Sequence, residues 1–312
     1  MREENKQMRI LSAIGMILVV AGHLGYSLFD VGGLFPYYSF HVFIFLFVSG
    51  YFYREEAEQQ LLRYIGKKCK ALLLPYFIWN LVYGILAVLL HRTGFSIGGE
   101  LTLWNLFIEP FVSGHQFLYQ FPAWFVPALF LIEVLNVLGR KVLSFLHLKK
   151  EWLIFAVSLL LGIATVALAK GGHVWGYYKF PGRLLFMMPG FQLGRIYKEK
   201  LENRVNKISD GRYFFVVVGV QLLTTICCRG LAFSAVWVTG FANAAFIPYL
   251  TVVTGIAFWL RISDWISRIP SACSWFMEIG RHTYAIMMHH VFWFFVVNLI
   301  CYLLSRTTVW CA

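Results

Sequence analysis

Long apolar runs separated by short polar stretches make up most of the chain. A helix needs about 20 apolar residues to cross the hydrocarbon core of a bilayer, which is about 30 Å thick. The runs predict nine membrane-spanning helices, at roughly 10–29, 37–53, 71–91, 123–138, 152–169, 182–197, 213–228, 236–260 and 283–304. A tenth span is the alternative. The pattern therefore predicts an all-α, polytopic transmembrane helical bundle of about nine or ten spans.

Two segments do not fit this series of long apolar runs. Residues 271–279 are too short to span a bilayer, so we expect a half-helix packed against the bundle. Residues 54–70 carry several basic side chains and predict an amphipathic helix at the inner membrane surface. No second domain is evident, and residues 1–312 are expected to form a single integral-membrane domain.

The composition agrees with a membrane protein. Hydrophobic residues make up 59% of the chain and charged residues 13%, whereas a soluble domain typically carries about 25% charged residues. The formal net charge of +12 would also suit nucleic acid, but the basic residues lie in short stretches between apolar runs, as in cytoplasmic loops. We therefore expect a multi-pass protein of the cell membrane with a cytoplasmic N-terminus, partnered by the lipid bilayer and not by nucleic acid. The six cysteines lack metal-ligand spacing, so no metal is expected.

Two histidines lie at the ends of neighbouring apolar runs. His23 closes the first run, and His41 opens the second. Ionisable groups cost free energy inside a membrane, so they usually have a functional reason to be there. Helices joined by a short loop are usually neighbours. Both imidazoles are therefore expected near one membrane face, either as part of a site or as core histidines bonded to backbone carbonyls.

Several segments together resemble the integral-membrane acyltransferase-3 family. The first resembles the family's first helix and ends at His23, and residues 39–51 are similar to its second-helix pattern FHxPxFFxxSGY. The other matching segments are 68–79 (KxxRLLxPYxxW), 124–129 (WFLxAL), 183–194 (ending in PxFxLG) and 280–289 (GxxTxxIYxxH). The chain departs from the family at Ser12, where a basic residue is common and Arg9 lies one helical turn earlier.

The resemblance implies acyl transfer, commonly of an acetyl group from acetyl-coenzyme A. The acceptor would be a hydroxyl of an envelope or exported glycan, a lipid-linked sugar or a small molecule. Such a reaction needs a base, and histidine suits that role because its pKa lies near neutrality. His23 is the leading candidate for the base, and His41 would bind the acceptor or orient His23. Arg183 would hold a thioester or sugar oxygen, or it anchors its helix at the interface.

Further candidates follow from the same resemblance. Glu133, within the fourth span, would pair with a histidine or arginine as readily as it would take part in catalysis. His289 matches the late motif. The donor's phosphates would meet basic residues at the inner face, and the candidates are Arg9, Arg63, Lys67, Lys68 and Lys70. Basic residues are common in cytoplasmic loops in any case, so these residues can also be explained without a bound donor.

Two questions stay open at this stage. The donor's pantetheine arm would need a cavity that leads from the inner face toward His23. A transporter or flippase for a lipid-linked sugar is the alternative function, although such proteins often show internal repeats and none is obvious here. The sequence also leaves the oligomeric state open, with a homodimer among the alternatives.

Overall fold

The computed structural model describes residues 5–25, 30–92, 100–114, 117–148, 150–174, 176–231 and 243–305. These residues form helices, turns and connecting segments, and no β-strand occurs among them. The predicted all-α class is therefore confirmed. By its internal contacts the chain divides into two compact units: unit 1, with residues 1–61 and 132–283, and unit 2, with residues 62–131 and 284–312. The single domain expected over residues 1–312 stays a prediction.

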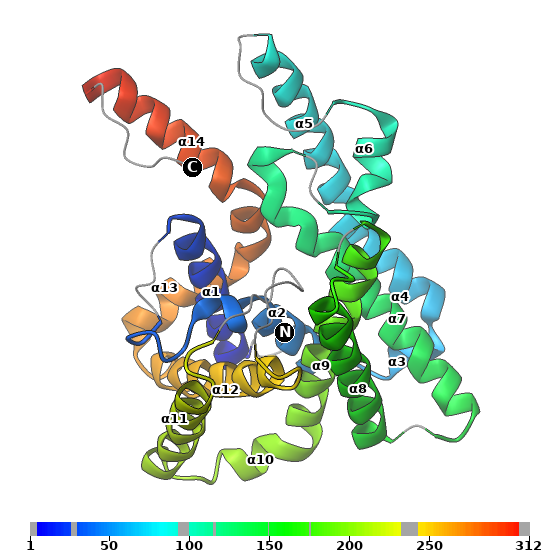
Figure 1. Cartoon of the computed structure of the whole chain (residues 1–312), viewed down its shortest axis with the longest axis vertical. Coiled ribbons are helices and arrows are strands. Elements are labelled where there is room, and N and C mark those ends of the chain that lie inside the picture. The colour runs from blue at the N-terminus through cyan, green and yellow to red at the C-terminus, as the bar shows by residue number, and fades with distance from the viewer. Residues whose placement is uncertain are drawn as a thin grey trace. The chain divides into compact units, whose positions relative to one another are not determined.

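Unit 1 contains most of the helices drawn in Figure 1. Its α-helices are α1 (Lys6–His23), α2 (His41–Tyr51), α3 (Glu56–Gln59), α8 (Glu151–Lys170), α9 (Lys179–Ile196), α10 (Glu202–Val205), α11 (Asp210–Cys227), α12 (Ile247–Ser267) and α13 (Pro270–Arg281). Shorter turns are the 3₁₀-helices η1 (Tyr37–Ser39) and η5 (Gly176–Tyr178) and the π-helical η6 (Tyr197–Leu201).

Unit 2 is built from both the middle and the end of the chain. It holds α4 (Leu61–Lys68), the π-helical turn η2 (Cys69–Leu73), α5 (Leu74–His91), α6 (Leu103–Phe107), the 3₁₀-helices η3 (Glu109–Phe111) and η4 (Leu118–Trp124), and α14 (Thr283–Ser305). The first residues of α4 and α14 are assigned to unit 1, and α7 (Phe125–Phe145) begins in unit 2 and ends in unit 1.

Within the described ranges, five helical segments are long and apolar enough, by length and composition, to cross a membrane. They are Leu61–His91, Leu118–Phe145, Glu151–Lys170, Asp210–Cys227 and Thr283–Leu304. The count of nine or ten spans stays a prediction. Parts of two predicted spans, residues 26–29 and 236–242, lie outside the described residues.

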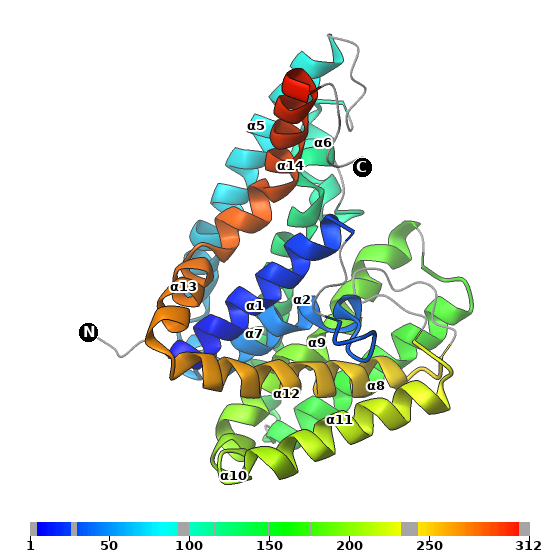
Figure 2. The same ribbon diagram turned by 90° about the vertical axis from the view of Figure 1, so that its left-hand side faces the viewer.

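Helices α1 and α2 form an antiparallel hairpin. The Asn5 side chain caps α1 by accepting a hydrogen bond from the Met8 amide at 3.0 Å. Gly15 packs against Ile44, and Gly22, farther along α1, packs against Tyr37, just before α2. Helix α13 lies along α1 (Figure 2), so the short segment predicted as a packed half-helix does form one.

Helices α2 and α9 run in the same direction and approach closely because glycines lie between them. Gly190 faces the Phe43 ring, and Gly194, one turn later, faces the Phe47 carbonyl one turn further along α2. A side chain at Gly194 would meet backbone atoms, which cannot rotate away. Small residues commonly permit this kind of backbone approach between membrane helices.

A Gly194→Ala substitution is therefore expected to lower the apparent melting temperature of the purified protein. Its Cβ would overlap the Phe47 carbonyl, and overpacking of this kind typically costs about 1–3 kcal/mol. Gly219→Ala on α11 is the matched control, because a Cβ there meets nothing within 4 Å. Thermal unfolding in detergent would show a loss for Gly194→Ala and none for the control. Equal melting temperatures for both variants would contradict this account of the α2–α9 packing.

Candidate active site

The α1–α2 hairpin brings two of the candidate histidines to the same end of unit 1. His23 is the last residue of α1, and His41 is the first residue of α2. Because the two helices are antiparallel, these terminal positions lie at one end of the pair. His23 is half-buried, whereas His41 is only 5% exposed.

The protonation pattern of the His41 ring follows from its hydrogen bond. Its Nδ1 lies 2.8 Å from the backbone carbonyl oxygen of Tyr37. A carbonyl only accepts hydrogen bonds, so Nδ1 carries the hydrogen and donates it. In the neutral ring, Nε2 then holds the lone pair. The local geometry thus prepares Nε2 of His41 to accept a proton or a hydrogen bond.

Tyr37 contacts both helix ends. Its ring centroid lies 5.6 Å from that of His41 in an edge-on arrangement, and the same ring packs against Gly22 at the end of α1. The Asp30 carboxylate accepts a hydrogen bond from the Tyr37 amide at 3.0 Å and so ties the connecting loop to this residue. Burial raises the pKa of the Asp30 carboxyl. Tyr37 and Asp30 therefore fix the position of the carbonyl that binds His41.

Arg183 lies toward the same end of unit 1. It is in the second turn of α9 and is 1% exposed. The ring of Phe186, one turn later, packs edge-on against Phe43 near the start of α2, with the centroids 5.3 Å apart. Because α2 and α9 run in the same direction, Arg183 lies on the His41 side of this contact. We refer to this end of unit 1, with His23, Tyr37, His41 and Arg183, as the histidine end.

Glu133 contacts the other end of α2, away from His41. Its carboxylate accepts a hydrogen bond from the Ser49 hydroxyl, and the residue is 1% exposed. Ser49 comes eight residues after His41 in the chain, which corresponds to a rise of about 12 Å along a helix. Glu133 is therefore grouped with the far end of α2 and not with the histidine end.

His289 belongs to unit 2, on α14. Its Nδ1 lies 2.8 Å from the Tyr83 hydroxyl, and the Trp79 ring meets it edge-on with the centroids 4.2 Å apart. A hydroxyl can both donate and accept, so this contact does not decide which ring nitrogen carries the hydrogen. His289 and Tyr83 form a second polar contact, inside unit 2.

The basic candidates fall into two groups. In unit 1, the Arg9 guanidinium donates to the Gly280 carbonyl at 3.3 Å, close to the C-terminus of α13, where a positive charge is favourable. In unit 2, Arg63, Lys67 and Lys70 are exposed, and Lys68 lies over the Tyr64 ring at 5.6 Å. These four residues follow one another along α4 and η2, as expected of an amphipathic segment.

A family profile described as "Acyltransferase domain" matches residues 5–311, nearly the whole chain. The chain belongs to the acyltransferase-3 family. Neither the search of curated proteins nor the search of solved structures finds a match. The resemblance noted in the sequence is thereby confirmed, and acyl transfer is the activity that this family membership supports.

Sequence reasoning did not single out three residues of this acyltransferase-3 protein. Two of them contact a candidate histidine, and the third, Asp30, fixes the position of one of these two. Tyr37 and Asp30 organise the histidine end, and Tyr83 contacts His289. Asp30 stands in a loop with Gly32, Gly33 and Pro36, and such turn chemistry is the one local signal available. The Tyr37–His41 hydrogen bond joins residues four apart and depends on the 3₁₀ turn Tyr37–Ser39, which no short motif marks. The Tyr83–His289 contact joins segments that are distant in the sequence.

A Gly22→Ala variant of this acyltransferase is expected to keep its stability and lose activity. The added Cβ would lie 2.8 Å from Cζ and 2.9 Å from the hydroxyl oxygen of Tyr37. The ring can swing aside at little cost to the fold, but its movement disturbs the residue that holds His41. Displacements of about 1 Å can cost a hundredfold in rate. We expect a 10- to 100-fold slower acyl transfer with an unchanged melting temperature, and a normal rate would show that the Tyr37 ring has no part in the site.

Proposed function

We propose that this acyltransferase moves an acetyl group from acetyl-coenzyme A to a hydroxyl of an envelope or exported glycan, or of a lipid-linked sugar. Family membership supports the acyltransferase activity. The observation that carries the more specific proposal is the histidine end, where two imidazoles and a buried guanidinium gather in unit 1. The comparisons give no support to the alternative of a transporter or flippase.

The proposed chemistry uses one imidazole and the guanidinium in turn. An imidazole, with His23 as the leading candidate, takes the proton from the acceptor hydroxyl. The resulting oxygen attacks the thioester carbonyl, and a tetrahedral oxyanion forms. The Arg183 guanidinium stabilises that negative charge in a low-dielectric setting. When the intermediate collapses, the carbon–sulfur bond breaks, the thiolate leaves and takes up the proton, and the acceptor is left as an acetyl ester.

His41 has a supporting part in this scheme. Its Nδ1 is committed to the Tyr37 carbonyl, so Nε2 is available to bind the acceptor hydroxyl or to orient His23. Glu133 is proposed to act through Ser49 in the packing of α2. His289, whose Nδ1 contacts the Tyr83 hydroxyl, is proposed as a further catalytic histidine.

The opposite end of unit 1 is proposed to face the cytoplasm. Arg9, Arg140, Lys150, Arg195 and Lys200 lie on elements that begin or end there, as the positive-inside rule predicts. The exposed cations Arg63, Lys67 and Lys70, with Lys68, are proposed to meet the donor's phosphates. The histidine end of unit 1 then faces outward.

The proposal is tested with acetyl-coenzyme A labelled in the acetyl group. Membranes that contain the protein are expected to release free coenzyme A thiol and to gain label in equal amounts. Mild alkali should remove that label, because it cleaves acetyl esters and leaves amides intact. Alkali-stable label would contradict O-acetylation, and thiol release without any bound label would contradict transfer to an acceptor.

A further inference from the structure

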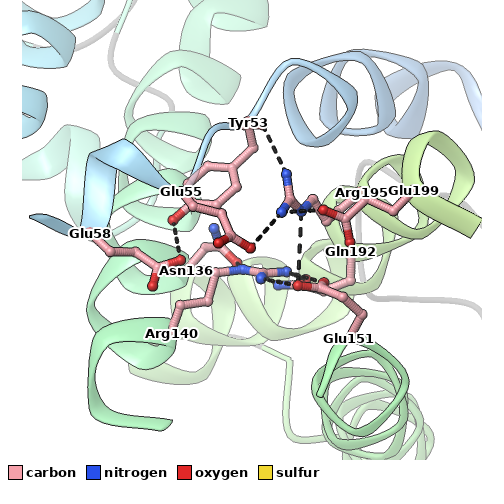
Figure 3. Close-up of polar contacts among 9 residues, drawn as sticks. All are labelled: Tyr53, Glu55, Glu58, Asn136, Arg140, Glu151, Gln192, Arg195 and Glu199. Atoms are coloured by element: carbon pink, nitrogen blue, oxygen red, sulfur yellow. Dashed lines mark hydrogen bonds and ion pairs between the residues drawn. The ribbon is translucent and has the colours of Figure 1, made fainter. Parts of the chain in front are cut away.

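A polar network occupies the end of unit 1 opposite the histidines (Figure 3). Arg140, 1% exposed, makes a two-pronged ion pair with Glu151, at 2.6 and 2.7 Å. Arg195, 5% exposed, pairs with Glu55 at 2.9 Å and with Glu199 one turn later. The carboxylates of Glu55, Glu151 and Glu199 lie within 4.8 Å of one another.

This network forms one wall of a cavity of about 600 Å³. The cavity is lined by Glu55, Lys150, Glu151, Trp152, Leu153, Glu199 and Lys200. It therefore presents carboxylates and ammonium groups side by side. Glu151 is largely occupied by Arg140 and has a side chain only 11% exposed, whereas the Glu55 side chain is 56% exposed.

A second hollow, of about 340 Å³, adjoins the first because Leu153 lines both. It runs between α7, α8 and α9, and its walls are mostly aliphatic. Leu153, Val157 and Leu161 of α8 are 41–49% exposed and line it. We call this hollow the α7–α8 groove.

The α7–α8 groove has a polar floor formed by Asn136, Arg140 and Gln192. Asn136 Oδ1 accepts hydrogen bonds from Gln192 at 2.6 Å and from Arg140 at 3.0 Å. Asn136 is 4% exposed, and its Nδ2 has no hydrogen-bond partner among the described residues. A buried amide donor of this kind costs free energy unless a ligand accepts its hydrogen bond.

We propose that this face of unit 1 binds an ethanolamine phospholipid. Its ammonium group lies at Glu55 and Glu199, its phosphate at Lys150 and Lys200, and one acyl chain enters the α7–α8 groove past Leu153. Asn136 Nδ2 is inaccessible and without a hydrogen-bond partner among the described residues; binding of that chain turns the Asn136 side chain so that Nδ2 donates a hydrogen bond to the ester carbonyl. The zwitterionic head of this ligand matches the charged cavity, and its apolar tail matches the α7–α8 groove.

The carboxylate cluster alone would also suit a divalent cation, but the surroundings favour the lipid. Glu55, Glu151 and Glu199 together carry one more charge than Arg140 and Arg195, which suits a monovalent ammonium group better than a divalent ion. A metal ion bound by all three carboxylates would also have to compete with the two-pronged Arg140–Glu151 pair. A metal ion also leaves the aliphatic groove and the Asn136 amide unexplained.

Native mass spectrometry of the purified protein tests the proposal with three phospholipids that share the same acyl chains. Phosphatidylethanolamine is expected to bind at least about tenfold more tightly than phosphatidylcholine or phosphatidylglycerol. Only its headgroup joins a positive charge to N–H donors, whereas choline has no N–H or O–H donor and glycerol has hydroxyl donors but no positive charge. A Glu55→Gln/Glu199→Gln double variant is expected to lose that preference. Equal binding of the three lipids to the unaltered protein would overturn the proposal, as would binding of Mg²⁺ in place of the lipid.

The α7–α8 groove is tested with a matched pair of tryptophan substitutions on α8. Val157→Trp fills the groove and is expected to remove the bound lipid. Leu160→Trp serves as the control, because Leu160 is 65% exposed on the same helix and does not line the groove. Retention of the lipid by Val157→Trp would overturn the placement of the acyl chain. If that variant does not fold, the headgroup comparison on the unaltered protein still decides the proposal.

Discussion

A His41→Asn variant is expected to transfer acyl groups at least about a hundredfold more slowly than the unaltered protein while keeping its melting temperature. The asparagine amide can replace Nδ1–H as the donor to the Tyr37 carbonyl, a bond that measures 2.8 Å in the structure. It offers nothing at the position of Nε2. Without Nε2, the acceptor hydroxyl or His23 loses the group that orients it, and a misplacement of about 1 Å can cost about a hundredfold in rate.

A His41→Gln variant separates the role of Nδ1 from the role of Nε2. Glutamine places a polar atom near the position of Nε2 but loses the short-range donor to the Tyr37 carbonyl. If His41 matters only because it holds Tyr37, the asparagine variant will be active and the glutamine variant will not. That outcome would reduce His41 to a positioning residue and contradict a direct role for its Nε2.

The second large effect is expected on stability. Glu151→Ala leaves the Arg140 guanidinium buried beside Asn136 and Gln192, without the carboxylate that it contacts at 2.6 and 2.7 Å. Removing one partner of a buried ion pair typically costs about 3–5 kcal/mol. We expect a value near 3 kcal/mol, because the adjoining cavity admits water to the site.

Thermal unfolding of the purified protein measures this effect. Glu278→Ala is the matched control, because Glu278 pairs with Arg281 and His282 on an exposed surface of α13. Exposed ion pairs contribute little to stability, so this variant should melt close to the unaltered protein. Similar melting temperatures for Glu151→Ala and Glu278→Ala would show that the Arg140–Glu151 pair does not hold α7 and α8 together.

Much of the fold could be predicted, because the apolar runs indicate helices and the charged stretches between them indicate where the helices end. The half-helix α13 was expected from a run too short to span a bilayer, and it forms over Pro270–Arg281. The start of α2 was placed four residues too early, since Pro36 and the 3₁₀ turn Tyr37–Ser39 precede it. The number of spans stays a prediction, because length and composition single out five segments among the residues that the structure describes.

The candidate site was predictable in outline and not in detail. The expectation that neighbouring runs are adjacent put His23 and His41 near one membrane face, and the antiparallel helices α1 and α2 agree with it. The place of Arg183 on the His41 side follows from the parallel packing of α2 and α9. The Arg140–Glu151 pair could not be predicted, because eleven residues along one helix separate two side chains by about 16 Å. The contact forms because α7 ends at Phe145 and the chain turns back before α8 begins at Glu151. In the sequence, Arg140 lies between the predicted spans 123–138 and 152–169, in a stretch that also holds Lys141, Lys149 and Lys150. Its burial follows from the approach of α7, α8 and α9, which is a tertiary feature.

The central claim is that an imidazole at the histidine end takes the acceptor's proton during acyl transfer from acetyl-coenzyme A. The most direct measurement compares transfer of labelled acetyl groups in membranes that contain equal amounts of the unaltered protein, His23→Ala or His173→Ala. His173 is an exposed histidine in the loop after α8 and serves as the control. We predict that His23→Ala loses at least about a hundredfold in rate and that His173→Ala keeps the full rate. Undiminished transfer by His23→Ala would contradict the account.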